Sequence, residues 1–287
     1  MKIAALQMVS TPRVSDNLSA AVRLMRQAAG DGASLVALPE YFCLMGHSDR
    51  DKLTIAEDAG RGPIQDTLSA TAAELGLWVI GGTLPVRCEP QAGEDGERVT
   101  NSCFVYAPDG RQLARYDKIH LFRYSSGQEF YDEARVLRAG TQPVATTLAL
   151  SAGRPLRLGL SVCYDLRFPE LYRALSVLPG APPCDLIAVP SAFTFTTGKV
   201  HWEVLLRARA IENQCFVIAP AQGGTHENRR RTWGHSLIVD PWGEILALKP
   251  EGEGVVSATL DFDRLAAVRQ QLPALSHVRQ FGHNQRV

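Results

Sequence analysis

Leu158-Gly-Leu-Ser-Val-Cys163-Tyr-Asp-Leu-Arg-Phe-Pro-Glu-Leu-Tyr172 joins an apolar, strand-like run to the start of a helix through a short polar turn. The run ends at Cys163, and Phe168-Pro-Glu170 places a proline where the first turn of a helix accepts one. A helix that points its positive end at the thiol would favour a thiolate and an oxyanion. The segment therefore predicts either a cysteine nucleophile or a buried cysteine at the end of a strand, a common role for free cysteine.

The composition of the 287 residues limits the classes of partner and compartment. Lys+Arg and Asp+Glu balance at 30 each, which argues against nucleic acid or an anionic membrane as the main partner. We expect no membrane span and no signal peptide, because the apolar runs are short and the N-terminal stretch quickly becomes polar. The cysteines are scattered, which predicts free thiols in a reducing compartment and hence a cytoplasmic location. They are Cys43, Cys88, Cys103, Cys163, Cys184 and Cys215.

Strand-like and helix-like stretches alternate along almost the whole chain. Helices are predicted near 15–30, 63–75, 200–213 and 262–271, and from residue 168 onward. Strands are predicted at 2–8, 35–38, 78–82, 101–106, 111–116, 144–148, 156–161, 185–189, 215–219, 235–239, 244–248 and 254–260. We expect one domain of layered sheets and helices over residues 1–287, with 272–287 as a C-terminal tail, while the pattern leaves the strand order open.

Three reactive side chains lie at or near the ends of predicted strands. Glu40 follows Leu35-Val-Ala-Leu-Pro39, where apolar walls would raise its pKa and suit a general base; the alternative is an exposed loop glutamate. Lys118 follows a hairpin strand, where its cation could stabilise an oxyanion and hold a thiol as thiolate; the alternative is an ion-paired surface lysine. Cys163 is the third. Together they predict a catalytic unit more strongly than any of them does alone.

Three motifs in this order resemble the signatures of the nitrilase superfamily of carbon–nitrogen hydrolases. They are Leu38-Pro-Glu40, Tyr116-Asp-Lys-Ile-His-Leu-Phe122 and Val162-Cys-Tyr-Asp-Leu-Arg-Phe-Pro-Glu170. The resemblance implies an α/β fold, a four-layer αββα sandwich. It also implies a triad in which Glu40 is the general base, Lys118 stabilises the oxyanion, and Cys163 is the nucleophile. The backbone N–H of Tyr164 would be the second oxyanion donor.

The resemblance extends to a further carboxylate and to a branch of the family. Glu133, seven residues before Gly140, matches a glutamate that would orient the substrate and place Lys118, whereas Glu129 is expected to be a solvated loop carboxylate. The runs His201-Trp-Glu and Asp240-Pro-Trp-Gly243 are similar to the branch that contains deaminated-glutathione amidase and ω-amidase. That branch hydrolyses amides of 2-oxo acids through a cysteine thioester.

Candidate substrate-binding residues surround these motifs. Arg167 could bind a substrate carboxylate, or it could form a structural ion pair with Glu170 or Asp165. Phe195, Thr196 and Thr197, expected in a loop after a strand, could line the pocket or simply pack. The basic run at 229–231 is expected to be a solvated loop, and the alternative is a contact with an anionic substrate tail.

Several alternatives stay open. The chain could be another hydrolase of the family, such as a nitrilase or N-carbamoyl amidase, or a Cys-His enzyme with His120 as base. A non-catalytic scaffold would not need Glu40, Lys118 and Cys163 together. The mechanism needs no cofactor and no metal, and the histidines are dispersed. The resemblance also implies a homodimer that pairs through the helix after Cys163 and the helix at 200–213.

Overall fold

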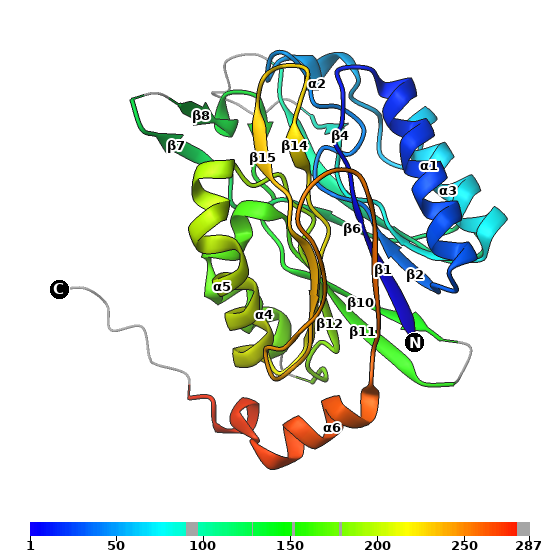
Figure 1. Ribbon diagram of the computed structural model, residues 1–287, viewed down its shortest axis with the longest axis vertical. Helices are drawn as coiled ribbons and strands as arrows, with labels where there is room; N and C mark the ends of the chain where they lie inside the picture. Colours follow the sequence, from blue (N-terminus) through cyan, green and yellow to red (C-terminus); the bar gives the residue numbers. More distant parts are fainter. Residues whose placement is uncertain (90–96, 128, 151–152, 178–179, 280–287) are drawn as a thin grey trace.

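The computed structural model describes residues 1–89, 97–127, 129–150, 153–177 and 180–279, and it has two stacked sheets between two pairs of helices (Figure 1). The first sheet has eight strands in the order β18-β1-β2-β3-β5-β4, with β6 and β9 paired to β5. The second has six strands in the order β10-β11-β12-β13-β16-β17. This arrangement confirms the predicted four-layer αββα sandwich.

The strands of the two sheets mostly follow the predicted ranges. In the first sheet they are β1 (Lys2–Gln7), β2 (Leu35–Ala37), β3 (Trp78–Ile80), β4 (Leu84–Arg87), β5 (Val99–Tyr106), β6 (Gln112–Asp117), β9 (Leu137–Arg138) and β18 (Gly254–Thr259). In the second they are β10 (Val144–Ala149), β11 (Pro155–Leu160), β12 (Leu186–Ala188), β13 (Phe216–Ala219), β16 (Ser236–Val239) and β17 (Ile245–Lys249).

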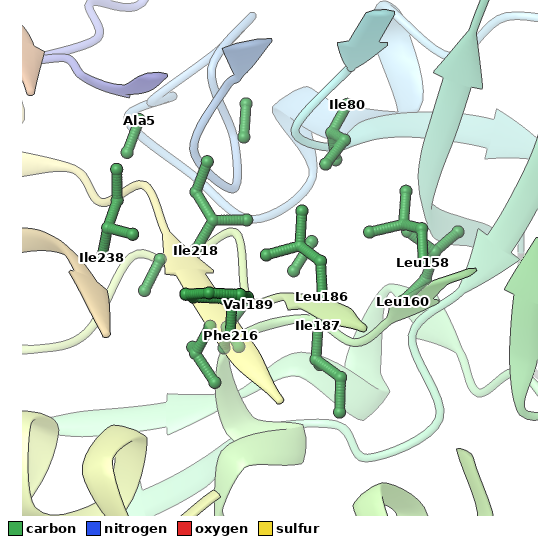
Figure 2. Packing of buried hydrophobic residues seen from close by; sticks show 14 of the residues in the cluster. Ala5, Ile80, Leu158, Leu160, Leu186, Ile187, Val189, Phe216, Ile218 and Ile238 are labelled. Atoms are coloured by element: carbon green, nitrogen blue, oxygen red, sulfur yellow. The ribbon is translucent and has the colours of Figure 1, made fainter. Parts of the chain in front are cut away.

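The main hydrophobic core lies between the two sheets. Alternate residues of a strand point to opposite faces, so Ala5 of β1 joins this core while Leu6 packs under the helices of the first sheet. Figure 2 shows Ala5 and Ile80 of the first sheet across from Leu186 and Ile218 of the second. Because the middle strands are covered on both faces, they read as continuous apolar runs in the sequence.

Helices cover the outer face of each sheet (Figure 1). The first sheet packs on α1 (Val14–Gly30) and α3 (Pro63–Leu75), and the second on α4 (Pro169–Ser176) and α5 (Phe195–Asn213). The helix α6 (Phe262–Gln271) follows β18, and a short α2 (Asp51–Thr54) precedes α3. A 3₁₀ turn spans Ala274–His277 in the expected C-terminal tail, whose residues 280–287 lie outside the described residues.

The start of α5 differs from the prediction. The helix begins at Phe195 instead of near residue 200, because the Thr194 hydroxyl caps the backbone N–H of Thr197. Phe195 and Thr196 therefore lie on a helix and not on a loop. On α4, the helix after Cys163, the residues Leu171, Tyr172 and Leu175 belong to the core of this chain, because α4 packs them against the second sheet. Of the two readings that the sequence left open for them, core packing or a dimer contact, the structure favours core packing.

Short hairpins replace two segments expected as loops. The stretch after β6 contains β7 (Arg123–Ser125), β8 (Phe130–Asp132) and a 3₁₀ turn at Glu133–Arg135. The basic run belongs to a second hairpin, formed by β14 (Gly223–Thr225) and β15 (Arg231–Trp233). Both hairpins extend from the same end of the sandwich (Figure 1).

Gly140 offers a test of the close packing beside Lys118. Its N–H donates to the Lys118 carbonyl at 2.8 Å, and a Cβ at this position would overlap the Asp117 carbonyl oxygen. We expect Gly140→Ala to lower the free energy of unfolding by about 1–3 kcal/mol, because backbone must move to admit the methyl group. Gly30→Ala, whose Cβ would meet nothing within 4 Å, is the matched control. Equal urea midpoints for the two variants would contradict this account.

Candidate active site

Glu40 lies just beyond β2, at the carboxyl end of a buried strand. Its carboxylate is 1% exposed and accepts hydrogen bonds from Asn101 Nδ2 at 2.9 Å and from the Ala192 backbone N–H at 3.0 Å. Lys118 Nζ contacts the same carboxylate at 2.8 Å. The donors come from both sheets, since Asn101 belongs to β5 and Ala192 follows β12. These hydrogen bonds fix the orientation of the Glu40 carboxylate. Its two oxygens have about four acceptor sites, so one remains that could accept a proton.

Lys118 follows β6 and is fully buried. Its Nζ lies 2.8 Å from a carboxylate oxygen of Glu40 and 2.8 Å from one of Glu133. Burial alone would lower the pKa of Lys118, but the Glu133 and Glu40 carboxylates raise it above its ordinary value. The lysine is therefore a permanent cation at the bottom of the site.

Glu133 lies in the 3₁₀ turn after β8. Besides Lys118, it accepts hydrogen bonds from the Tyr41 hydroxyl at 2.6 Å and the Phe122 N–H at 2.7 Å. Burial would raise the pKa of Glu133, but Lys118 and these donors lower it on balance. Glu129 instead accepts a hydrogen bond from Thr196 Oγ1. The structure thus brings Glu133, and not Glu129, to Lys118.

Cys163 begins a 3₁₀ turn, Cys163–Arg167, directly after the strand-like run. Its φ of 50° lies in the left-handed region, which costs a non-glycine residue about 1–3 kcal/mol. The Cys163 N–H donates to the Pro190 carbonyl at 2.9 Å, which holds this turn against the loop after β12. The strain is therefore maintained by the surrounding structure and presents the thiol beside Glu40.

The surroundings of the Cys163 thiol oppose the thiolate that the helix start and Lys118 were expected to favour. Burial is the largest effect that raises its pKa, and the Glu40 carboxylate raises it further, while Lys118 lowers it less. Two carboxylates already outnumber the one lysine in this buried cluster. A thiolate would add a further negative charge with no second cation in the triad to balance it. The charges of the cluster therefore favour the protonated thiol.

His120 has a different role from the base of a Cys-His pair. Its Nδ1 is 2.7 Å from Asp165 Oδ1, and its ring stacks on Phe168 with centroids 3.6 Å apart. Asp165, expected from the sequence only as a possible ion-pair partner of Arg167, also accepts hydrogen bonds from the Tyr116 hydroxyl and from the Val162 N–H. The Asp165 carboxylate thus ties the nucleophile turn to the Lys118 segment. Its signal in the sequence was its position two residues after Cys163.

A small pocket of ≈ 10 Å³ opens onto Cys163, room for about one water molecule. Its walls are Glu40, Phe122, Glu133, Cys163, Tyr164, Arg167, Ala192, Phe193, Thr194, Thr197 and Arg230. A substrate needs more space than this, so lining side chains must rotate as it binds. Three of the predicted pocket residues, Tyr164, Arg167 and Thr197, lie here.

Phe195 and Thr196 do not line the pocket. Successive helical side chains point about 100° apart, so only one of three consecutive residues at the start of α5 faces the thiol. That residue is Thr197. Phe195 packs edge-on against Trp233 and under Arg231, and Thr196 is exposed. In a loop all three side chains could have faced the pocket, so the sequence did not distinguish Thr197 from Phe195 and Thr196.

Arg167 and Arg230 are the cations of the pocket wall besides the buried lysine. Arg167 contacts His201 Nδ1 at 3.2 Å and lies over the Tyr164 and Phe193 rings, and no ion pair to Glu170 or Asp165 forms within the described residues. Arg230 was missed as an individual site residue, because its run reads as a solvated loop until the β14–β15 hairpin is formed.

Over the described ranges, no group of three or more His, Cys, Asp or Glu side chains could hold a metal ion. Nor does any helix within those ranges have the length and apolar character to cross a membrane.

The protonation state of Cys163 can be measured directly. We expect the ultraviolet difference spectrum between the wild-type protein and Cys163→Ala to show no thiolate at neutral pH, because burial and Glu40 raise the thiol pKa. In Glu40→Gln the thiolate should form at lower pH than in the wild type, since one negative neighbour is gone while Lys118 stays. A full thiolate signal at neutral pH in the wild type would show that this reading of the charges is wrong.

Comparison with known proteins agrees with this geometry. Residues 2–270 match the family model described as carbon–nitrogen hydrolase. The chain is 45% identical over 276 residues to the deaminated glutathione amidase of Synechocystis sp., with 96% of each chain covered. It is 35% identical to omega-amidase NIT2 of Homo sapiens, with 97% of this chain and 95% of that protein covered.

The fold also matches a solved structure. The crystal structure of the C. elegans NitFhit protein superposes with a TM-score of 0.83 and 34% sequence identity. The match covers 97% of this chain and 65% of the longer NitFhit chain. With the three motifs in order, the sandwich fold and a family match over nearly its whole length, this chain belongs to the carbon–nitrogen hydrolase family.

Proposed function

We propose that this protein is a thiol amidase that hydrolyses the amide of a small 2-oxo acid, of the deaminated-glutathione type, through a cysteine thioester. The observation that carries the proposal is the buried contact of Lys118 with Glu40 and Glu133 beside the Cys163 thiol. The 45% identity to a deaminated glutathione amidase supports this substrate class. The 35% identity to an omega-amidase makes 2-oxoglutaramate the second candidate substrate.

The first half of the reaction forms the thioester. Glu40 takes the proton of the neutral Cys163 thiol as the sulfur attacks the amide carbon. The oxygen of the tetrahedral intermediate is stabilised by the Lys118 ammonium and by the backbone N–H of Tyr164. The carbon–nitrogen bond then breaks, and the amine leaves with the proton that Glu40 had accepted.

The second half hydrolyses the thioester. Glu40, again a carboxylate, takes a proton from water as the water oxygen attacks the thioester carbon, and the same donors hold the second oxyanion. The carbon–sulfur bond breaks, the sulfur regains a proton from Glu40, and the acid is released. Glu133 keeps Lys118 in position through both halves, because it forms a second buried ion pair with the Nζ besides that of Glu40.

The pocket wall supports an anionic acyl group. Arg167 has no carboxylate partner within the described residues, so its guanidinium is available to the carboxylate of a 2-oxo acid. A substrate whose acyl group has no carboxylate would leave the Arg167 guanidinium without a negative partner. Thr197, which also lines the pocket, adds a hydroxyl beside the acyl group.

The proposal includes an assembly and a location. A homodimer is supported by the outer face of α5, where Val200, Val204 and Ile211 are exposed, Val204 at 67%. The loop that carries the exposed Trp242 packs against the same helix at Gly243. Apolar side chains grouped on one helix face are typical of a protein–protein interface. We also infer a single domain over residues 1–287 and a cytoplasmic location. The location is supported by the buried free thiols of Cys43, Cys103, Cys163, Cys184 and Cys215.

A hydrolysis screen tests the reaction. Purified protein would be incubated with deaminated glutathione, 2-oxoglutaramate, nitriles and N-carbamoyl amino acids, with product acid and amine measured separately. We expect turnover of the 2-oxo-acid amides and a loss of at least about a thousandfold in Cys163→Ala, because no other group can form the thioester. Nitrile hydrolysis without amide turnover would refute the amidase, and retained activity in Cys163→Ala would refute the nucleophile.

A second test concerns the acyl carboxylate. We expect Arg167→Gln to lower kcat/KM for 2-oxoglutaramate by about 10- to 100-fold, the value of a charge-assisted hydrogen bond in a partly buried site. Hydrolysis of a simple aliphatic amide should change little, and Lys199→Gln, an exposed cation on α5, should leave both substrates unaffected. An equal loss on both amides would mean that Arg167 acts on the fold of the site and not on the substrate carboxylate.

A further inference from the structure

The two carboxylates that share the Lys118 ammonium are not equally satisfied by hydrogen bonds, and Glu133 is the more fully occupied of the two. Its Oε1 accepts from the Tyr41 hydroxyl at 2.6 Å and from Lys118 Nζ at 3.1 Å. Its Oε2 accepts from the Phe122 N–H at 2.7 Å and from the same Nζ at 2.8 Å. A carboxylate has about four acceptor sites, so these four contacts fill Glu133 and favour its ionised form.

Glu40, in contrast, keeps one acceptor site open. Its Oε1 accepts from Asn101 and Lys118, and among the described residues its Oε2 accepts from the Ala192 N–H. Without the Tyr41 hydroxyl, each carboxylate of the cluster would have three contacts and one open site. The tyrosine therefore creates the difference between the two carboxylates.

The backbone of Tyr41 brings its side chain to this cluster. Neighbouring side chains of an extended strand point to opposite faces, which would send Glu40 and Tyr41 in different directions. The φ of Tyr41 is 57°, in the left-handed region, which is strained for a residue with a side chain. Its N–H donates to Thr83 Oγ1 at 2.9 Å and so holds the turn. Both side chains then reach the Lys118 cluster, one as a carboxylate and the other as a donor.

The Tyr41 hydroxyl keeps its hydrogen in these surroundings. The residue is 5% exposed, and its burial and the charges of Glu133 and Glu40 raise the pKa of the hydroxyl well above its ordinary value, while Arg230 lowers it less. The tyrosine is thus a permanent donor to Glu133. The charged groups around this hydrogen bond are Lys118 and Glu40 in the cluster, Arg230 in the β14–β15 hairpin, and Lys52, whose Nζ lies 4.9 Å from the Tyr41 ring centroid.

We propose that Tyr41 is a positioning residue that keeps Glu133 ionised and so confines the catalytic proton to Glu40. This inference rests on the proposed amidase function. Glu133 lines the same pocket as Cys163, so an open acceptor site on Glu133 would let it compete for the thiol proton. A proton on Glu133 would leave Lys118 with one ion pair in place of two, and Glu40 would have no proton to pass to the leaving amine. The hydrogen bond from Tyr41 prevents both.

The pH dependence of Tyr41→Phe tests this role, because the substitution removes the hydroxyl and keeps the ring. Loss of the donor raises the pKa of Glu133, so activity should be lost at a higher pH as the solution becomes more acidic. We expect the acid limb of the kcat profile for 2-oxoglutaramate to move up by about one pH unit. At the pH optimum kcat should fall by about 10-fold. The KM should change by less than about threefold, since Tyr41 does not line the pocket at Cys163.

Tyr106→Phe is the matched control. Tyr106 is 2% exposed and packs under the helices of the first sheet, and its hydroxyl has no hydrogen-bond partner among the described residues. Removing this hydroxyl should leave kcat and the acid limb unchanged. Equal losses in the two variants, or an acid limb that stays in place in Tyr41→Phe, would overturn the role of Tyr41 while leaving the amidase intact.

A second measurement keeps Tyr41 and strengthens its hydrogen bond. Protein produced with 3-fluorotyrosine has more acidic phenols, which are stronger donors to a carboxylate, so its acid limb should move to lower pH. The same label in Tyr41→Phe should leave the limb of that variant in place. If Tyr41→Phe does not fold, an acid limb that the label leaves unmoved in the wild type would overturn the role of Tyr41. A wild-type protein that hydrolyses no 2-oxo-acid amide would overturn the proposed function itself.

Discussion

The buried contact of one lysine with two glutamates is the constraint on which the rest of the site depends. Lys118 is fully buried, and Glu40 and Glu133 each approach its Nζ to 2.8 Å. A charged lysine in such a place is tolerated only when its partners are held firmly, because breaking a buried pair leaves an uncompensated charge. The Asn101, Ala192, Tyr41 and Phe122 donors supply that support.

The same cluster explains the state of the nucleophile. With two carboxylates and one ammonium, the site already carries an excess of negative charge, which favours the protonated Cys163 thiol. In the proposed mechanism this proton passes to Glu40 as the sulfur attacks. This separates the enzyme from those that store a preformed thiolate beside a cation. A neutral thiol is also less open to adventitious oxidation, since the thiolate is the reactive form.

The two sheets contribute different parts of the chemistry. Glu40, Lys118 and Glu133 belong to the first sheet and its connections, whereas Cys163, Ala192 and Arg230 belong to the second sheet and the segments around it. The site lies where these two halves meet, so the packing of the central core sets the distance between base and nucleophile. A sandwich with rigid, interdigitated sheets can hold that distance closely.

Local sequence was sufficient for most of the elements and for the three family motifs. Apolar runs, proline at helix starts and the hairpin turn at 107–110 depend on neighbouring residues, so most of the longer strands and helices lie near their predicted ranges. The short strands β4, β7, β8, β9, β14 and β15 were not predicted. The prediction for Phe195 was wrong. The stretch of threonines and phenylalanines around it was expected to be a loop, but Thr194 caps a helix that begins at Phe195. Only the helix shows that Thr197 lines the pocket at Cys163. Glu133 was preferred over Glu129 from the family motif, and the Lys118 contact is consistent with that choice.

The sequence by itself determined the α/β layering, the three motif residues and the absence of a strong charge bias, because these are set by residue type and spacing. Only the tertiary structure showed that Glu133 contacts Lys118, that burial and Glu40 raise the pKa of the Cys163 thiol, that Asp165 holds the Cys163 turn, and that Arg230 lines two cavities. Each of these depends on groups far apart in the chain whose distance and burial are fixed by the packing of two sheets, and a local pattern carries no information about that distance.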